Sequence, residues 1–358
     1  MPHREKKSKK SKSVLSFAAE KALMTNAISN ALKQKEFASL GEAQAFLGQF
    51  VGMEMSEIIS KVGGESGGEA SKQKADELFF EAIDADDVKT TRRGLREVLR
   101  LDPDHVRART AIAFMEKSPI KVEKGLREAI AIGERQLGKL LEESRGSLWG
   151  RVEARPYLEA RLGLAEFLGG WEERMGEAIS EYQELLDLNA VDNQGARFEL
   201  LGLLLEERRF EEAERLIATY DGDDTAAWAY GKAFLAFQTA VRESNFDPSG
   251  SDREWLANRW QSVGDFEALP ESTFGAANTA LLLAFSNNPW CAGYLLERQK
   301  FLKEELPESH TPGSRGEARV FLKTQGIAWT QDISAHLWLA QTFVGFLKDD
   351  GSDDHFAN

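Results

Sequence analysis

The sequence is short of cysteine and proline, and both shortages restrict the kind of protein it can encode. Its single cysteine, Cys291, cannot form an intrachain disulfide and leaves a cysteine-based zinc site without its other ligands. A reducing compartment fits this best, and we expect a cytoplasmic protein. Nine prolines in 358 residues interrupt the chain rarely. Because proline breaks helices, its scarcity leaves room for long helical segments.

The β-branched residues and tyrosine are also scarce, whereas leucine, alanine and glutamate are plentiful. Straight-chain residues lose little side-chain freedom in a helix and β-branched ones lose more, so this composition favours helix. A hydrophobic content of 42% excludes wholesale disorder. The composition therefore predicts an all-α protein, and 358 residues suffice for two ordinary domains or one elongated repeat array.

Long hydrophobic runs are missing as well. No run approaches the ~18 apolar residues that a helix needs to span a bilayer. The segment 14–28 contains Glu20, Lys21 and Asn26, so it lacks the uninterrupted apolar core of a secretory signal peptide. The sequence predicts neither a signal peptide nor a membrane partner.

The net charge of −14 is distributed unevenly along the chain. Residues 1–13 have a net charge of +5, and subtracting this from −14 leaves −19 on residues 14–358. An acidic body repels nucleic acid, whereas the basic tail could contact its phosphates. Blocks of like charge are typically disordered, so we expect disordered tails, basic over 1–13 and acidic over 348–358. The lysines of the basic tail are Lys6, Lys7, Lys9, Lys10 and Lys12.

Two amphipathic helices are expected near the N-terminus. Apolar residues recur on one helical face from 14 to 35, and Ser39 and Glu42 then form a capping box that starts a second helix. The apolar stripe of this second helix needs a packing partner, and the preceding helix is the nearest one. We therefore predict an N-terminal helical pair over residues 14–61.

A glycine-rich segment follows this pair. Four of the six residues from Gly63 to Gly68 are glycine, and ordering them in a helix is entropically costly, so we predict a flexible linker over 62–73. The two end glycines have the spacing of a phosphate-binding loop. However, Glu69 and Ala70 stand where lysine and serine or threonine must follow, and a carboxylate repels phosphate. We therefore predict no nucleotide site and no cofactor.

Beyond the linker, one helical pattern recurs. It has a small residue, a large one four positions later, a small one three positions after that, and a proline five further on. The pattern resembles the second helix of a tetratricopeptide repeat, in which small residues let two helices approach closely. Ala213 follows Ala178 by 35 residues, near the period of ~34 for that repeat. We predict a tetratricopeptide-like solenoid, an α-α superhelix of antiparallel helix pairs, over 74–347. The matching sets are Ala277, Leu281, Ala284 and Pro289; Thr91, Leu95, Val98 and Pro103; and Ala178, Tyr182 and Leu185, with Ala190 in place of proline.

Several segments also resemble one particular family of tetratricopeptide-type proteins, the suppression-of-tumorigenicity-seven-like family and its bacterial relatives. The resemblance is strongest over 145–235 and weaker over 74–144 and 275–347. It implies a fold of helix pairs and an interaction role, and it does not imply a substrate. Residues 244–273 depart from it and look like an insertion. The segments that carry it are 148–157, 161–165, 188–189, 192–197 and 294–296.

Catalytic and metal-binding patterns are absent from the sequence. None of the five histidines lies at helical spacing from another, and no G-x-S-x-G motif occurs. Cys291 lies at an apolar helix start, which favours an inert buried thiol. His336 is expected in the core or at an interface. We therefore predict no catalytic residues, no metal site and a protein that is not an enzyme.

The repeat pattern does predict a partner-binding face. A solenoid of helix pairs receives a peptide or a partner domain on the concave face formed by the first helix of each pair. The residues expected to face inward are acidic and apolar, so the expected protein or peptide partner has basic and apolar residues. An alternative for Phe198 is that it only packs between helices. The predicted partner-binding residues are Glu159, Leu162, Glu166, Phe198, Glu199, Leu205 and Glu206.

Three interpretations of the function follow. The first is a non-catalytic scaffold or adaptor that binds a protein on the concave face. The second is a nucleic-acid-associated factor whose basic tail contacts phosphate. The third is an enzyme, which would require a closed pocket with convergent polar groups.

The second interpretation has a direct test. If the basic tail binds nucleic acid, removing residues 1–13 should abolish retention of the protein on immobilised RNA or DNA. The retention of the full chain should also fall steeply as salt rises, because binding releases counterions from the phosphates. Equal retention of the full and truncated chains would argue against this interpretation.

Overall fold

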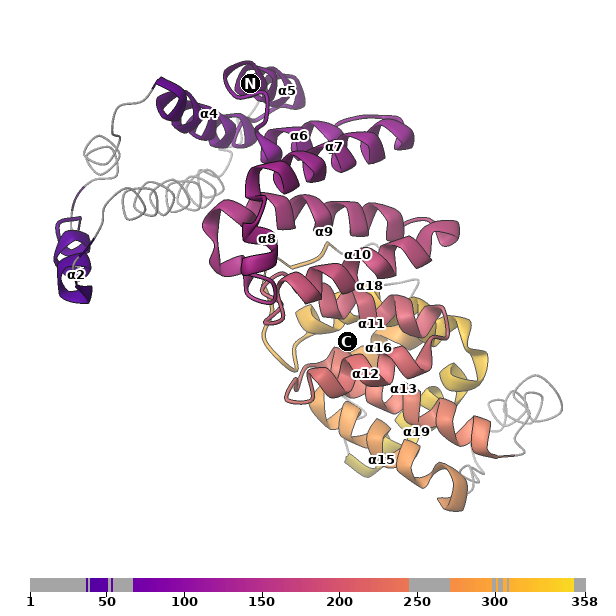
Figure 1. Cartoon of the computed structure of the whole chain (residues 1–358). Coiled ribbons are helices and arrows are strands. Elements are labelled where there is room, and N and C mark those ends of the chain that lie inside the picture. Colours follow the sequence, from indigo (N-terminus) through magenta and orange to yellow (C-terminus); the bar gives the residue numbers. More distant parts are fainter. Residues whose placement is uncertain are drawn as a thin grey trace, which may run out of the picture. The chain divides into compact units, whose positions relative to one another are not determined.

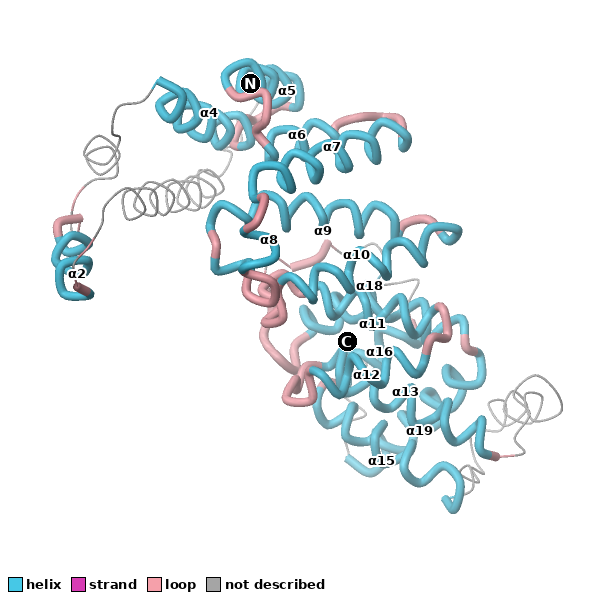
Figure 2. Tube along the Cα trace, viewed as in Figure 1, coloured by secondary structure: helices cyan, strands magenta, loops and turns pink. Residues whose placement is uncertain are grey.

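The computed structural model describes residues 39–50, 67–244, 271–297 and 309–350, together with residues 37, 53, 301 and 305–307. Within these residues the chain is helical and contains no β-strand (Figure 2). An isolated antiparallel bridge joins Ser147 and Asn189. The prediction of an all-α protein is therefore confirmed. None of the described helices is both long enough and apolar enough to cross a membrane.

The chain divides between Gln194 and Gly195 into two compact units, which we call unit 1 and unit 2. The predicted solenoid over 74–347 was drawn as a single array, so this division was not foreseen. Each unit is described by itself below.

Helix α2 (Leu40–Gly48) begins where the sequence predicts. Ser39 is its N-cap, and the Ser39 hydroxyl accepts a hydrogen bond of 3.3 Å from the main-chain N–H of Glu42. This is the serine half of the predicted capping box. The other helix of the predicted N-terminal pair, over 14–35, lies outside the described residues.

The predicted linker over 62–73 overlaps helix α4 (Gly67–Ile83), so the prediction is wrong from residue 67 onward. Gly67 and Gly68 stand in the first turn, where the main-chain N–H groups have no helical partner in any case. The helix is stabilised further along, where Ala75 and Phe79 are buried against α5. Packing on a neighbouring helix therefore outweighs the entropic cost of two terminal glycines. Residues 62–66 lie outside the described part of the chain.

Between residues 67 and 188, unit 1 forms three helix pairs that pack in chain order (Figure 1). The second helix of one pair contacts the first helix of the next, α5 with α6 and α7 with α9. A longer connection between the second and third pairs contains the short helix α8 (Leu140–Glu143) and two 3-10 turns, 148–150 and 152–154. The pairs are α4 with α5 (Val88–Leu101), α6 (Val106–Phe114) with α7 (Pro119–Leu137), and α9 (Arg155–Gly169) with α10 (Met175–Leu188).

The first two pairs are copies of one packing arrangement. A Cβ atom added to Gly94 would lie 2.6 Å from the Cβ of Ala82, and one added to Gly125 would lie 2.7 Å from that of Ala113. Both contacts join residues that are 12 positions apart, and the second contact lies 31 positions after the first. The sequence Gly-Leu-Arg-Glu occurs at both places, over 94–97 and 125–128. This 31-residue spacing differs from the 35 residues between Ala178 and Ala213 on which the prediction rests.

Most of the repeat positions that the sequence predicted are core residues. The second helices bury the small and large side chains that let them approach their neighbours. Pro289 lies at the first position of α16, after the N-cap Asn288, and so starts a helix. The buried members of the predicted sets are Leu95, Val98, Ala178, Tyr182, Leu185, Ala213, Ala277, Leu281 and Ala284.

Unit 2 is a bundle in which the chain returns to its own beginning. In a linear solenoid each pair contacts only its neighbours, but here α18 packs against α11, the first helix of the unit. A linear array therefore does not describe unit 2. Its helices are α11 (Ala196–Glu206), α12 (Phe210–Thr219), α13 (Ala226–Glu243), α15 (Glu271–Asn287), α16 (Pro289–Leu296), α18 (Arg315–Gln331) and α19 (Ile333–Asp350).

A buried carboxylate fastens the start of α18. Glu317 is only 4% exposed. It accepts hydrogen bonds from the main-chain N–H of Ala226 at 2.9 Å and of Gly313 at 2.7 Å, and from the Asn288 side chain at 2.9 Å. Burial is the main reason why the pKa of the neighbouring Cys291 thiol lies well above its ordinary value, and the charge of Glu317 adds to it. Cys291 is buried, as expected.

The predicted segment boundaries near the C-terminus shift slightly. The predicted acidic tail over 348–358 overlaps the end of α19, which extends to Asp350. The predicted insertion over 244–273 overlaps the start of α15 at Glu271. The basic tail over 1–13 lies outside the described residues, as do 245–270 and 351–358.

The close approach of α11 and α18 generates a stability prediction. A Cβ atom on Gly202 would overlap the main-chain carbonyl of Thr324, so Gly202→Ala should lower the free energy of unfolding by about 1–3 kcal/mol, the usual cost of overpacking. Gly176→Ala in α10 is the matched control, because a Cβ there meets no atom within 4 Å. That change should raise stability by about 0.5–1 kcal/mol through helix propensity. Thermal melting of the full chain measures both, and an unchanged Gly202→Ala variant would contradict the packing.

Candidate partner-binding site

The predicted partner-binding residues fall in both units. Glu159, Leu162 and Glu166 lie on α9 of unit 1. Phe198, Glu199, Leu205 and Glu206 lie on α11 of unit 2. The two groups are therefore considered separately.

On α9, the carboxylate of Glu159 is already paired within the chain. The Arg107 guanidinium donates two hydrogen bonds to it, of 2.6 and 2.7 Å, and the Arg107 side chain is only 19% exposed. Burial alone would lower the pKa of Arg107, but the hydrogen bonds and the charge of Glu159 raise it above its ordinary value. Leu162 is half-buried and Glu166 is exposed. Of the three predicted residues on this helix, Glu166 thus offers the most exposed charge.

On α11, the face assigned to a partner is covered by α18. Gly202 packs against the α18 main chain, and the nearest carboxylate oxygen of Glu199 lies 3.9 Å from the Lys323 ammonium of α18. Leu205 is 1% exposed and packs in the core, which corrects the prediction that it faces a partner. Glu206 is half-buried. The chain itself occupies the surface that the repeat pattern predicted to be open.

Phe198 contributes to a cluster of rings around one cation. The Arg197 guanidinium carbon lies 4.2 Å from the centre of the Phe198 ring, and the Phe198 and Trp228 ring centres lie 5.4 Å apart with the rings nearly perpendicular. Asp223 pairs with Arg197 at 2.8 Å. Burial alone would raise the pKa of Asp223, but hydrogen bonds from Thr225 and Arg197 lower it below its usual range. These contacts favour the packing alternative for Phe198.

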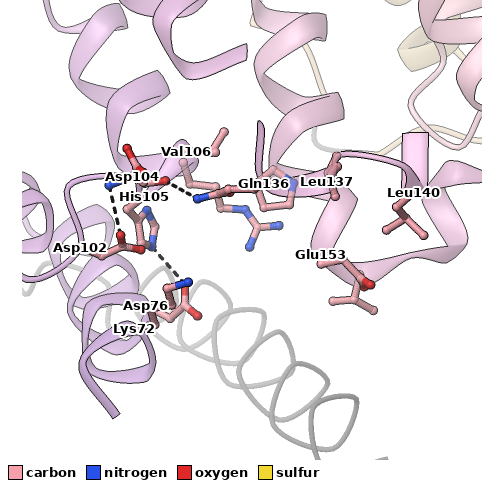
Figure 3. A pocket seen from close by; sticks show the side chains of 13 residues that line it. Lys72, Asp76, Asp102, Asp104, His105, Val106, Gln136, Leu137, Leu140 and Glu153 are labelled. Carbon is pink, nitrogen blue, oxygen red and sulfur yellow. Dashed lines mark hydrogen bonds and ion pairs between the residues drawn. The ribbon is translucent and has the colours of Figure 1, made fainter. Parts of the chain in front are cut away.

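A pocket of about 540 Å³ lies in unit 1, where the α5–α6 turn, the end of α7 and the start of α9 converge (Figure 3). We call it the acidic pocket. Its apolar part is formed by side chains from α6, α7, α8, a 3-10 turn and α9, and its charged part by α4, the α5–α6 turn, the start of α6 and the same 3-10 turn. The apolar residues are Val106, Leu137, Leu140, Val152 and Pro156.

Carboxylates dominate the charge of this pocket. Asp76, Asp102, Asp104 and Glu153 line it, against the cations Lys72 and Arg107. Since Glu159 already neutralises Arg107, the surplus is negative. Two of these carboxylates come from the short turn between α5 and α6, and a side-chain contact from α7 fixes that turn. The Gln136 side-chain amide donates a hydrogen bond of 2.8 Å to the main-chain oxygen of Asp104.

His105 holds the turn and one carboxylate in place. It is the N-cap of α6, where its Nδ1 accepts a hydrogen bond of 3.1 Å from the main-chain N–H of Ala108. An accepting Nδ1 leaves the ring proton on Nε2, which lies 3.0 Å from a carboxylate oxygen of Asp76 and donates to it. The sequence predicts no role for His105. Histidine is an unusual N-cap, so the sequence carried little signal for it.

The described residues hold no group of three or more His, Cys, Asp and Glu side chains placed to bind a metal ion. Comparison of the chain with protein-family models, with curated proteins and with solved structures finds no match in any of the three. The family resemblance noted in the sequence therefore stays a prediction.

A second hollow of about 250 Å³ lies between the α6–α7 turn and the end of α9. Ile120, Phe167 and Trp171 form its apolar wall. An ion-pair network closes one side, in which Glu123 accepts hydrogen bonds of 2.9 Å from both Arg174 and Arg127. The hydrogen bonds from Arg174 are the main cause that lowers the pKa of Glu123 to about 2.

This network predicts a pH-dependent stability. The pKa of Glu123 is about 2 in the folded chain and near 4.5 in the unfolded chain. Its contribution to the free energy of unfolding is therefore complete above about pH 4.5 and is lost as the pH falls toward 2. Glu123→Gln should therefore lower stability by ~1 kcal/mol at neutral pH and by progressively less in acid. Thermal melts across this range test it, with Glu173→Gln as the control from the same hollow. If the difference in stability between the wild-type chain and Glu123→Gln does not change with pH, the result would count against the network.

Proposed function

We propose that the protein is a non-catalytic scaffold or adaptor and that the acidic pocket of unit 1 receives a basic, partly apolar segment of a protein partner. The observation that carries this proposal is the pairing of surplus carboxylates with an apolar lining in one concave site. A volume of about 540 Å³ falls within the range of ligand pockets and admits one or two side chains of a peptide.

The charges in the pocket suit a lysine or arginine side chain. Asp76 is held by His105 and Asp104 lies 3.5 Å from the Arg135 guanidinium, so an incoming cation would join carboxylates that are partly paired within the chain. The aliphatic stem of a lysine or arginine can pack on Leu137 and Leu140 while its charged end reaches the carboxylates. Rim carboxylates would also speed the encounter with a basic partner.

The pocket lies at a different place from the one expected of a solenoid. The repeat pattern assigned the partner to α9 and α11, but α18 covers α11 and Arg107 neutralises Glu159. The proposed partner is therefore still basic and partly apolar, but it binds at the turn between the first two helix pairs. Its residues come from α4 to α9 and lie within unit 1.

Charge reversal at the pocket rim tests the proposal. We expect a labelled peptide of lysine and leucine to bind the full chain. The double variant Asp104→Lys with Glu153→Lys should raise the dissociation constant of this peptide at least about tenfold. Glu211→Lys with Glu214→Lys is the matched control, because it changes the net charge equally at exposed positions of α12 in unit 2.

Fluorescence anisotropy provides the dissociation constants, and melting curves confirm that each variant is folded. A peptide in which glutamate replaces lysine should not bind the pocket. Equal weakening by the two double variants would mean that overall charge, and not this pocket, attracts the peptide. Failure of the wild-type chain to bind the lysine peptide would reject the proposed site.

A further inference from the structure

A strip of exposed cations runs along α5. Arg92 faces the next helix pair, where its guanidinium donates to the main-chain oxygen of Met115 and pairs with Glu116 at 3.4 Å. Lys89 and Arg96 stand three positions before Arg92 and four after it, so they lie on the same side of the helix. Both are exposed. The strip therefore borders the junction between the first and second helix pairs.

Helix α7 lines the other side of the same junction. A hollow of about 220 Å³, which we call the seam hollow, is lined by Leu99 of α5, by the C-terminal half of α6, and by Lys121 and Lys124 of α7. Its floor is apolar, because Leu99 and the α6 residues Ile112 and Ala113 form it. The apolar floor is thus flanked by basic side chains from two helices.

The carboxylates at this seam are already neutralised. Glu116 pairs with Arg92 at 3.4 Å, Glu128 pairs with Arg109 at 3.8 Å, and Glu97 pairs with Arg100 at 2.6 Å. Among the residues that the structure describes, Lys89, Arg96 and Lys121 form no ion pair. The surplus charge around the seam hollow is therefore positive, although the whole chain carries −14.

An exposed aliphatic side chain lies next to these cations. Ile120, which directly precedes Lys121 in the first turn of α7, is 80% exposed. Val88 has the same relation to Lys89 at the start of α5 and is also exposed. Two successive helix pairs thus present an aliphatic residue followed by a lysine, and of these four residues Lys121 lines the seam hollow while Ile120 lines the second hollow.

We propose that the seam hollow binds an acidic amphipathic segment of a second protein partner. An aliphatic side chain of that segment enters the hollow above Leu99 and Ile112, and its carboxylates pair with Lys89, Arg96 and Lys121. Amphipathic helices bind in this way, with apolar residues at helical spacing placed in a hollow and charges at its edge. The site is separate from the acidic pocket, because it uses the opposite ends of α6 and α7.

The lining favours a protein over a nucleic acid. Single-stranded nucleic acids bind where aromatic side chains stack on their bases next to a basic track. The seam hollow is lined by aliphatic and charged residues and by no aromatic residue among the described ones. An aliphatic floor matches leucine, isoleucine or valine of a peptide.

Peptide binding to the full chain tests this proposal. The probe is a fluorescein-labelled peptide of glutamate and leucine, with the leucines on one helical face. We expect the double variant Arg96→Glu with Lys121→Glu to raise the dissociation constant of this peptide at least about tenfold. Arg215→Glu with Lys232→Glu is the matched control, because it changes the net charge equally at exposed positions of unit 2. Replacing the leucines of the peptide by serine should also weaken binding at least about tenfold.

Several outcomes would overturn the proposal. The proposal fails if the peptide does not bind the wild-type chain, or if the seam variant and the control variant bind it equally. It also fails if the serine peptide binds as tightly as the leucine peptide. Tighter binding of a labelled single-stranded oligonucleotide, lost in the seam variant, would assign the surface to nucleic acid. A dimer of the wild-type chain that forms as its concentration rises, and that the seam variant does not form, would assign it to a second copy. Melting curves establish that the seam variant is folded, and the lysine peptide tests the acidic pocket independently.

Discussion

The buried carboxylate of Glu317 is the interaction on which unit 2 depends. It joins the start of α18 to the main chain at the start of α13 and to the Asn288 side chain. A buried charge without such donors is strongly unfavourable, so the carboxylate and its donors stabilise the unit only when they are assembled together. With its start held in this way, α18 covers α11. Unit 2 is thereby closed on the face that a solenoid would leave open, and both proposed binding surfaces lie in unit 1.

Unit 1 separates its charges along a single short helix. The start of α6 carries His105 and lies at the acidic pocket, while its end lies at the basic seam hollow. A helix of this length is only about 13 Å long, so sites of opposite charge lie close together. Internal ion pairs such as Arg107 with Glu159 and Arg92 with Glu116 cancel the charges between them. Two surfaces of opposite charge therefore lie close together, and the two proposed partners differ in the sign of their charge.

Local patterns predicted much of the fold, and long-range contacts were beyond their reach. Ala178, Tyr182 and Leu185 were assigned to a buried face because helical periodicity is a property of neighbouring residues. The return of α18 to α11 could not be inferred, because no local pattern in either helix identifies a partner more than 90 positions away. The acidic pocket was missed for the same reason, since His105 and Asp76 are 29 positions apart. The repeated Gly-Leu-Arg-Glu sequence, by contrast, was visible and would have identified the second helix pair.

The bond between Ala226 and Glu317 spans 91 positions of the chain, and this has a consequence for synthesis on the ribosome. At typical rates of about 5–20 residues per second, the start of α13 emerges several seconds before the carboxylate that caps it. During that interval the leucine-rich face of α11 has no α18 to cover it. A nascent chain of this protein therefore presents exposed apolar surface until α18 has been synthesised, and it should engage chaperones during that interval.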